Sequence, residues 1–280
     1  MILDLLRPGP KRDLLTPFFT FKRLLEEDVK GALFDEVAKL RFEVYCQECK
    51  YLDESDFRDG KEVDDFDGRS IHVAAFNLEG AMVGTVRLVL AGEAEPYPFE
   101  EHCQVFPDFT FPPRDQCGEV SRLIVRKSFR RRAGDSLQGV SKEFQETGSA
   151  ANIGPAAPPP KTGNGGKPKR GGSSSPQIML GMYRELYRYS RKNGINYWYA
   201  AMEKGLAGLL DRMGFHFIPV GPEMDYYGPV TSYIADLRTL EADLRRANLF
   251  LAKWFHDEPI SLWLLVTTLI KFKFGKAGKF

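Results

Sequence analysis

The sequence predicts an α+β fold in which helices flank a single central sheet that is mixed but mostly antiparallel. β-rich runs and segments of helical periodicity alternate along the 280 residues. Two neighbouring β-rich runs, over 71–76 and 82–90, are joined by the short connection 77–80, which is typical of an antiparallel hairpin. No strand is followed by a G-x-G-x-x-G turn or a P-loop, so a doubly wound nucleotide-binding fold is excluded.

Each element follows from apolar periodicity and from the residues that end it. Phe34, Val37 and Leu40 recur at helical spacing. Gly194 and Gly214 end two later helices, since glycine accepts the left-handed backbone found there. In chain order we predict a helix over 34–45, strands over 71–76, 82–90 and 119–125, a helix over 177–192, a strand over 195–201, a helix over 204–213, strands over 215–220 and 231–237, and a helix over 240–255.

The composition changes abruptly between Ser149 and Ser175. This stretch is rich in proline, glycine, serine and lysine, and it has no acidic or aromatic residue. It cannot bury enough apolar surface to offset its ordering entropy, so we predict a disordered insertion over 149–176. We expect an N-terminal extension over 1–32, one domain over 33–237 that carries the insertion, and a C-terminal helical segment over 238–280.

Charge is uneven although the chain carries 39 basic and 38 acidic residues. Residues 53–67 hold eight acids, and residues 122–132 hold six bases and no acid. The basic run is either a solvated face or a surface that meets an anionic partner. Without a basic stripe elsewhere, nucleic acid is not an expected partner, and a noncatalytic module that binds anions is the less favoured alternative.

Targeting and metal signals are weak. The N-terminus shows no secretory signal, so we expect a cytoplasmic protein with reduced thiols. The longest apolar run, over 260–270, is too short to span a bilayer; packing on the body is favoured over peripheral membrane contact. Cys46 and Cys49 form a C-x2-C pair within a helix, but no second pair follows, so no metal site is expected.

The run from Glu119 to Val125 carries the clearest chemical signal. On a regular strand, alternation would place Glu119 and Ser121 on one face and Arg122 on the other. Glu119 and Arg122 therefore share a cleft only if a β-bulge or a splay re-aims one of them. A splayed strand would also free backbone groups for the amides of a ligand.

A basic turn follows this strand directly. Cationic side chains together with a glycine, at the start of a helix near Ser136, are suited to binding phosphate. The predicted phosphate-binding residues are Arg126, Lys127, Arg130, Arg131, Arg132 and Gly134.

Upstream carboxylates form a second candidate group. Asp64 and Asp67 could bind the ammonium group of a substrate, or pair with Arg41, Arg87 or Arg122. Arg87 lies inside an otherwise apolar strand, so it requires a carboxylate partner or a ligand.

Together these motifs resemble a known family. The series 40–45, 62–67, 84–88, 96–100 and 119–122, in this order and spacing, is similar to that of the acyl-homoserine-lactone autoinducer synthases and the N-acyl amino acid synthases, within the GNAT superfamily of N-acyltransferases. The resemblance is greatest to the acyltransferases that accompany PEP-CTERM/exosortase systems. It covers about residues 33–125 and implies a GNAT-like fold with a splayed central strand, so that 33–237 would be an acyltransferase domain.

The resemblance also implies an activity and its residues. An acyl group would pass from the phosphopantetheine of an acyl carrier protein, or from acyl-CoA, to the amine of an amino acid, with no tightly bound cofactor. Glu119 and Arg122 would be catalytic. The substrate-binding set would be Arg41, Tyr45, Tyr51, Asp64, Asp67, Arg87 and Ser121. The phosphate-loop pattern of the family survives only over 131–136, which favours a carrier protein over coenzyme A. A homoserine-lactone synthase that uses S-adenosylmethionine stays open as an alternative.

Overall fold

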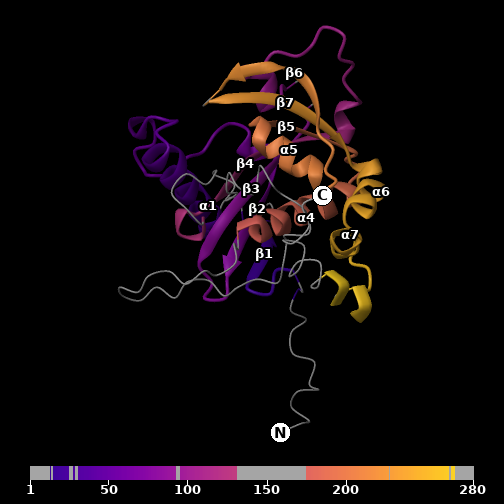
Figure 1. Ribbon diagram of the computed structural model, residues 1–280. Coiled ribbons are helices and arrows are strands. Elements are labelled where there is room, and N and C mark those ends of the chain that lie inside the picture. Colours follow the sequence, from indigo (N-terminus) through magenta and orange to yellow (C-terminus); the bar gives the residue numbers. More distant parts are fainter. Residues whose placement is uncertain are drawn as a thin grey trace.

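A seven-stranded sheet forms the centre of the molecule in this computed structural model, which describes residues 13, 15–24, 28, 31–92, 95–130, 175–226, 228–264 and 266–268. The strand order is β1-β2-β3-β4-β5-β7-β6 (Figure 1), and every neighbouring pair is antiparallel except β4 and β5. The predicted α+β fold with one mixed, mostly antiparallel sheet is therefore confirmed. The strands are β1 (Phe19–Arg23), β2 (Ser70–Asn77), β3 (Met82–Leu90), β4 (Cys117–Val125), β5 (Tyr197–Met202), β6 (Ile218–Asp225) and β7 (Pro229–Asp236); the helices are α1 (Ala32–Phe42), α2 (Pro98–His102), α4 (Ser175–Lys192), α5 (Lys204–Arg212), α6 (Leu237–Ala247) and α7 (Leu249–Phe255).

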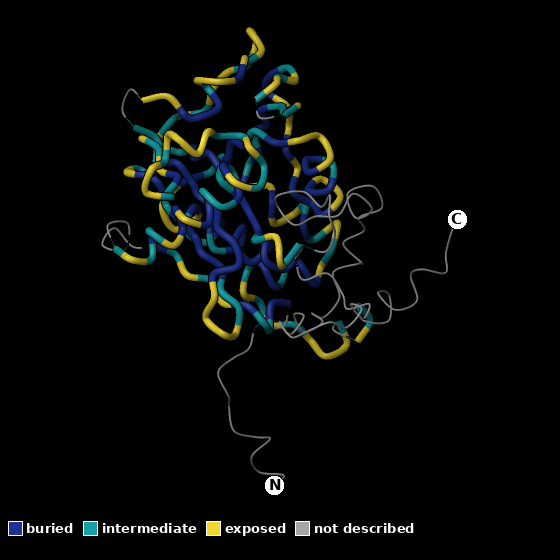
Figure 2. The backbone as a smooth tube through the Cα atoms, turned by 90° about the vertical axis from the view of Figure 1, so that its left-hand side faces the viewer, coloured by how far each residue is buried: buried dark blue, intermediate teal, exposed yellow. Residues whose placement is uncertain are grey.

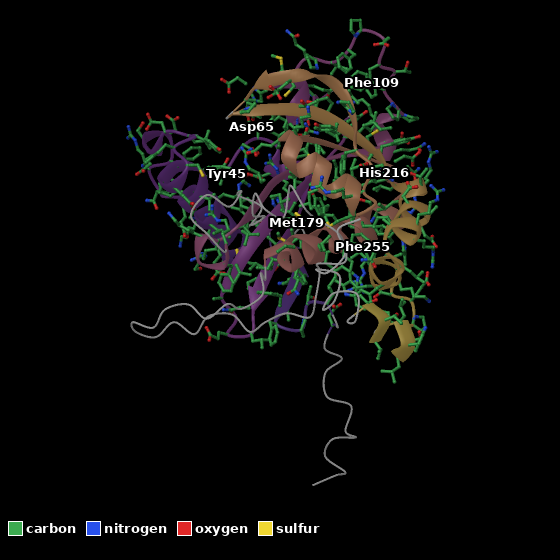
Figure 3. All side chains as sticks on the ribbon, viewed as in Figure 1. Tyr45, Asp65, Phe109, Met179, His216 and Phe255 are labelled. Carbon is green, nitrogen blue, oxygen red and sulfur yellow. The ribbon has the colours of Figure 1, made fainter. Side chains whose placement is uncertain are left out.

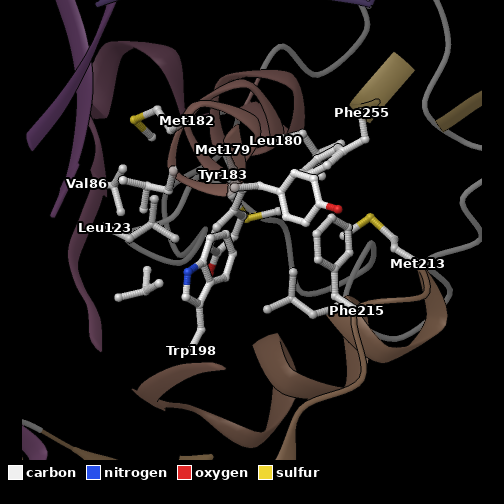
Figure 4. Close-up of a cluster of buried hydrophobic side chains, with 14 of the residues drawn as sticks. Val86, Leu123, Met179, Leu180, Met182, Tyr183, Trp198, Met213, Phe215 and Phe255 are labelled. Carbon is white, nitrogen blue, oxygen red and sulfur yellow. The ribbon is translucent and has the colours of Figure 1, made fainter. Parts of the chain in front are cut away.

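The two faces of the sheet pack against different helices. Val73 on β2 and Val86 on β3 join the core beneath α4, to which α4 contributes Met179 and Tyr183 (Figure 4). On β2 the next residue, Ala74, packs on the opposite face against α1. The interior between these layers is buried along most of β2 to β5 (Figure 2). All the candidate site residues on the strands lie on the α1 face.

Strand β4 carries the bulge that a shared cleft requires. Arg87 pairs with Ser121, but Thr85 pairs with Ile124, so β4 has one extra residue at this point. Arg122 has φ +52°, a left-handed backbone that is unusual for a residue with a side chain. The extra residue shifts the alternation, so that Glu119, Ser121 and Arg122 all lie on the α1 face.

Strands β4 and β5 also separate. Their parallel pairing runs only from Cys117↔Tyr197 to Glu119↔Tyr199, whereas β4 continues to Val125 and β5 to Met202. The predicted splay of the central strand is therefore confirmed, and it begins at Glu119. Beyond this residue, β4 is not paired with β5.

Several elements differ from the sequence prediction: α2 was not predicted, and β6 begins and ends later than the strand predicted over 215–220. The segment over 1–32 contains β1, which pairs with β2 and was not predicted. The single helix predicted over 240–255 is two helices, because the extended backbone of Asn248 interrupts it and the Asn248 side chain accepts from the N–H of Leu251 at 3.0 Å, capping α7. Helix α4 starts at Ser175, inside the predicted insertion; the rest of that insertion, with residues 131–148, lies outside the described residues.

The connection between α2 and β4 is held against β6 by a close backbone approach. The N–H of Phe106 donates to the carbonyl of Val220 at 2.8 Å. A Cβ atom on Gly221 would lie 2.0 Å from the carbonyl oxygen of Gln104. Only glycine leaves room for this contact, because a backbone oxygen cannot swing aside as a side chain does.

We therefore expect Gly221→Ala to destabilise the protein by about 1–3 kcal/mol, through forced displacement of the 103–116 connection. Gly208→Ala is the matched control, since its nearest contact would be a flexible arginine tip at 3.7 Å and alanine favours the helix. Urea unfolding of both variants checks this. Equal stability of the two variants would contradict the close approach.

Candidate active site

Six charged side chains meet on the α1 face of the sheet and form a group that we call the ion cluster. Three guanidinium groups come from α1, β3 and β4, and three carboxylates come from the connection that precedes β2. The members of the ion cluster are Arg41, Glu62, Asp64, Asp67, Arg87 and Arg122.

Asp67 ties α1 to β3. One of its carboxylate oxygens accepts from Nη1 of Arg41 at 2.6 Å and from Nη1 of Arg87 at 2.8 Å. The other accepts from the backbone N–H of Asp64 at 2.9 Å, which fixes the loop that carries these acids. Arg41 also donates to Glu62, and Arg87 to Asp64. Arg41 and Arg87 are fully buried, so their guanidinium groups contact other side chains of the protein and not solvent.

Arg122 closes the ion cluster on its more open side. Its Nη2 donates to Glu62 at 2.9 Å and to Asp64 at 2.9 Å. The guanidinium also lies over the ring of Tyr45, 5.3 Å from its centre. Tyr45 (Figure 3) belongs to the π-helical turn Glu43–Glu48 that continues α1, and π-turns of this kind are frequent at functional sites.

Opposite charges decide the ionisation of the buried acids. Burial by itself would raise the pKa of Glu62 and of Asp67, but Arg41 and its neighbouring guanidinium groups outweigh burial and hold both pKa values below their usual range. Burial lowers the pKa of His72 to about 4, so this imidazole is neutral at pH 7 although it lies beside Asp67. The cluster is therefore a set of charged groups that neutralise one another.

The ion cluster has a sealed part and an open part. The side chains of Arg41, Glu62 and Arg87 are at most 1% exposed. Those of Asp64 and Arg122 are 22% and 17% exposed. Ser121, which accepts from Nε of Arg87 at 3.1 Å, is half-buried beside them. Asp64, Ser121 and Arg122 are therefore the members of this region that are in contact with solvent.

Glu119 lies on the same face but outside these ion pairs. Its side chain is buried, and Oε2 accepts from the backbone N–H of Phe99 at 2.9 Å. Burial raises the pKa of Glu119 to about 8, and the hydrogen bond from the N–H of Phe99 and the charges of Arg87 and Arg122 only partly offset this rise. A carboxyl group with a pKa near neutrality is suited to taking and returning a proton.

An aromatic cluster borders Glu119 on the side of β5. Phe99 lies against Tyr199 with ring centres 4.8 Å apart, and Phe111 lies 6.3 Å from the same ring. The hydroxyl of Tyr97 donates to the carbonyl of Cys117 at 3.0 Å. Phe106 and Phe111 are 40% and 39% exposed, whereas Phe99 is buried. Aromatic packing therefore provides the dry surroundings that raise the pKa of Glu119.

The basic turn after β4 pairs with acids of the π-helical turn. Arg126 lies 3.5 Å from Glu43, while Arg130 and Lys127 both pair with Glu48. The side chain of Arg130 is only 5% exposed, so it fastens the turn to the body; that of Lys127 is 73% exposed. Arg131, Arg132 and Gly134 lie outside the described residues.

Two contributors escaped the sequence analysis. Glu62 links Arg41 to Arg122, and only its place in the motif 62–67 signalled it. The backbone of Phe99 holds Glu119, and no sequence pattern predicts that contact. Tyr51 is joined to the π-helical turn, because its N–H donates to the carbonyl of Tyr45 at 2.9 Å. Within the described residues, no three side chains could hold a metal ion, and Cys46 and Cys49 are free thiols.

Comparison with known proteins identifies the architecture. Residues 40–138 match the family model described as Acetyltransferase (GNAT) domain. The chain has the GNAT fold. A search of curated proteins finds no match.

Two solved structures of acyl-homoserine lactone synthases share this fold, with TM-scores of 0.50 and above. The CoA-dependent acyl-homoserine lactone synthase BjaI, with SAM and isopentyl-CoA, matches with a TM-score of 0.53 and 16% identity over 90% of this chain and 99% of that one. The AHL synthase LasI matches with a TM-score of 0.50 and 18% identity over 82% and 94%. FeeM, an N-acyl amino acid synthase from uncultured soil microbes, matches with a TM-score of 0.45 and 12% identity over 82% and 99%.

We expect Asp67→Asn to destabilise the protein by about 3–5 kcal/mol, because it leaves Arg41 and Arg87 buried with one neutralising charge fewer. Glu241→Gln on the surface of α6, whose carboxylate lies 2.9 Å from Arg245, should cost at most about 0.5 kcal/mol. Chemical denaturation at pH 7 measures both. A loss below 1 kcal/mol for Asp67→Asn would refute the tight coupling of the ion cluster.

Glu119 should also make stability depend on pH. Its pKa rises from the ordinary 4.5 to about 8 on folding, so the folded protein holds an extra proton between these values. Stability should therefore fall as pH rises from about 4.5 to about 8, by on the order of a few kcal/mol. Glu119→Gln should lack this decline, as urea titrations at pH 5 and pH 8 can show. Parallel pH dependence in the variant and the natural sequence would contradict the raised pKa.

Proposed function

We propose that this protein is an N-acyltransferase that moves an acyl group from a phosphopantetheine thioester to the amine of an amino acid or a related small molecule. The observation that carries the proposal is the position of Glu119. This carboxyl group with a pKa near 8 lies where β4 and β5 separate, and the open part of the ion cluster lies on the same face. A proton acceptor, polar anchors for a zwitterion and free strand backbone therefore adjoin one another.

The acceptor would bind at Asp64, Ser121 and Arg122. Asp64 would hold its ammonium group, and the Arg122 guanidinium would hold its carboxylate in a bidentate pair. Tyr45 and Tyr51 would form the adjacent aromatic wall. Arg41, Asp67 and Arg87 are sealed beneath these groups, so we assign them to positioning the side chains that touch the substrate.

Chemistry would proceed by direct attack. The bound ammonium group first loses one proton to solvent, so the acceptor attacks as a neutral amine. As the amine nitrogen forms a bond to the thioester carbonyl, the ionised form of Glu119, about a tenth of the molecules at pH 7 for a pKa near 8, takes a proton from that nitrogen, directly or through one water. The carbon–sulfur bond then breaks. Glu119 returns the proton to the leaving thiolate. Backbone N–H groups of β4 beyond Glu119 would stabilise the oxyanion.

The donor arm would lie between β4 and β5, with its amides paired to the free edge of β4. Lys127 and Arg126 at the end of β4, with Arg131, Arg132 and Gly134, would attract the phosphate and an acidic carrier protein. Arg130 would support the turn through Glu48. We favour an acyl carrier protein as donor over acyl-CoA, because the family's glycine pattern for gripping pyrophosphate is reduced in this sequence.

The second candidate is an acyl-homoserine-lactone synthase that uses S-adenosylmethionine. The shared fold with BjaI, whose structure holds SAM and isopentyl-CoA, motivates it. Both candidates use the same base and differ in the acceptor. The association with PEP-CTERM/exosortase systems stays a prediction from the sequence motifs.

Mass spectrometry of acylated products tests both candidates. Purified protein is given acyl carrier thioester or acyl-CoA, with a panel of amino acids or with S-adenosylmethionine. We expect an N-acyl amino acid as product, and a loss of at least about 100-fold in rate with Glu119→Gln. The rate of the natural sequence should rise with pH up to about 8, where the base becomes ionised.

The outcomes separate the candidates. Release of an acyl-homoserine lactone from S-adenosylmethionine would favour the synthase. An unchanged rate in Glu119→Gln, or a rate that does not respond between pH 6 and 8, would refute Glu119 as the base. Glu241→Gln serves as the control for an equal change of charge far from β4.

A further inference from the structure

The carboxyl group of Glu119 is held by a short helix whose own position is fixed from β4. Phe99 is the second residue of α2, so its N–H has no partner within the helix and donates to Oε2 of Glu119 at 2.9 Å. Helix α2 has only five residues, Pro98–His102, and a helix of this length is not stable by itself. The position of the Phe99 N–H therefore depends on the side chains that fasten α2.

Arg114 fastens α2 to the start of β4. It lies in the short turn Arg114–Gln116 immediately before β4, and its Nη1 and Nη2 donate to the two carboxylate oxygens of Glu100 at 3.0 Å each. Such a bidentate pair fixes direction as well as distance. Nη2 also donates to the carbonyl of Glu95 at 2.7 Å. One guanidinium group thus holds both the chain that leads into α2 and the first turn of the helix.

Tyr97 adds a second connection between α2 and β4. Its N–H donates to Oε2 of Glu100 at 2.7 Å, and the Arg114 guanidinium lies over its ring, 4.9 Å from the centre. Its hydroxyl donates to the carbonyl of Cys117, the first residue of β4, at 3.0 Å. The contacts therefore form a closed loop, which runs from β4 through Arg114, Glu100 and α2 back to Glu119.

The surroundings of Glu119 contain one acid that Arg114 neutralises. The titratable groups that face Glu119 are Arg87 on β3, Arg122 on β4, Tyr199 on β5, Glu100 on α2 and Cys103 directly after α2. Burial raises the pKa values of the tyrosine and of the thiol, so both are neutral at pH 7. Burial is also the main cause of the raised pKa of Glu119; the Phe99 N–H opposes this rise, and the negative charge of Glu100 adds to it.

We propose that Arg114 is a positioning residue for Glu119: through Glu100 it holds α2 where the Phe99 N–H meets the Glu119 carboxyl group, and it neutralises an acid that faces this group. The assignment rests on the proposed function, in which Glu119 is the base. The side chains of Arg114 and Glu100 are 35% and 19% exposed, so filling the core does not account for them. A partly exposed pair contributes little to stability, and variants of it should keep the fold.

NMR titration of the Glu119 carboxyl group tests the assignment without any substrate. The full-length protein is isotope-labelled at its glutamate carboxyl groups, and the Glu119 signal is assigned by its absence in Glu119→Gln. In Arg114→Gln the titration midpoint should rise by about 0.5 pH unit or more, because the carboxylate loses the Phe99 N–H and faces an unneutralised Glu100. In Glu100→Gln it should fall, since the amide keeps the hydrogen bonds and removes the negative charge.

Hydrogen exchange of the Phe99 amide reports its position directly. Exchange should be at least about tenfold faster in Arg114→Gln than in the natural sequence, because α2 is no longer fastened to β4. Arg114→Lys keeps the charge and loses the bidentate geometry, so its exchange rate should lie between the two.

Arg238→Gln is the matched control. Arg238 likewise pairs with an acid, Asp236 at 2.6 Å, and lies over a tyrosine ring, 4.9 Å from the centre of Tyr197. It is not among the groups that face Glu119. Its replacement should leave both the titration midpoint and the exchange of the Phe99 amide unchanged.

Kinetics connect the positioning role with the proposed chemistry. At pH 7, Arg114→Gln should lower kcat at least about threefold, since fewer molecules hold Glu119 ionised and correctly directed. KM should change less than about twofold, because Arg114 touches neither substrate in the proposed binding mode. The pH profile of kcat should move in the same direction as the NMR midpoint.

An unchanged Glu119 midpoint in either Arg114→Gln or Glu100→Gln would overturn the assignment, and so would unchanged exchange of the Phe99 amide in a folded Arg114→Gln. Circular dichroism establishes folding, and Glu100→Gln, which keeps its hydrogen-bond partners, decides the matter where Arg114→Gln does not fold. Both NMR measurements are made without acyl transfer. Absence of acyl transfer would therefore count against the proposed function and leave the positioning role standing.

Discussion

The backbone of Arg122 is the constraint on which the arrangement of this site depends. A left-handed residue with a side chain costs about 1–2 kcal/mol, and β4 adopts it in the middle of a buried sheet. The hydrogen bonds from Arg122 to Glu62 and Asp64 offset this cost. In return the strand presents Glu119, Ser121 and Arg122 on one face, which a regular strand cannot do. The same irregular strand then parts from β5, so one distortion serves both the acid–base group and the proposed acyl donor.

Burial is accompanied by opposite pKa shifts in the ion cluster and at Glu119: the pKa values of Glu62 and Asp67 are lowered, and that of Glu119 is raised. Asp67 and Glu62 are buried with guanidinium partners and stay ionised, which makes them structural anchors. Glu119 is buried without a guanidinium partner, which favours its neutral form, and the backbone N–H of Phe99 only partly offsets this effect of burial. Environment alone thus assigns different roles to acids within one face of the sheet. The sealed arginines keep this separation, because they bind their own carboxylates and leave Glu119 without a direct ion pair among the described residues.

Sequence patterns predicted the fold class, the splay and the need for a bulge. They did so because alternation is strict in strands, and an arginine within an apolar run must find a charged partner. Strand β1 escaped prediction, since its short alternating run lies far in sequence from β2, with which it pairs. The link from Phe99 to Glu119 escaped it as well, because a backbone donor leaves no trace in side-chain identity. Sequence could not show either that Arg130 is nearly sealed against Glu48, since burial depends on how the π-helical turn packs.

A crystal structure of the protein that resolves β4 tests the central claim most directly. The account predicts a positive φ at Arg122, with its guanidinium on Glu62 and Asp64, and with the Glu119 carboxyl group on the same face where β4 parts from β5. A regular β4 that pairs with β3 and β5 along its whole length, with Arg122 on the α4 face, would contradict it.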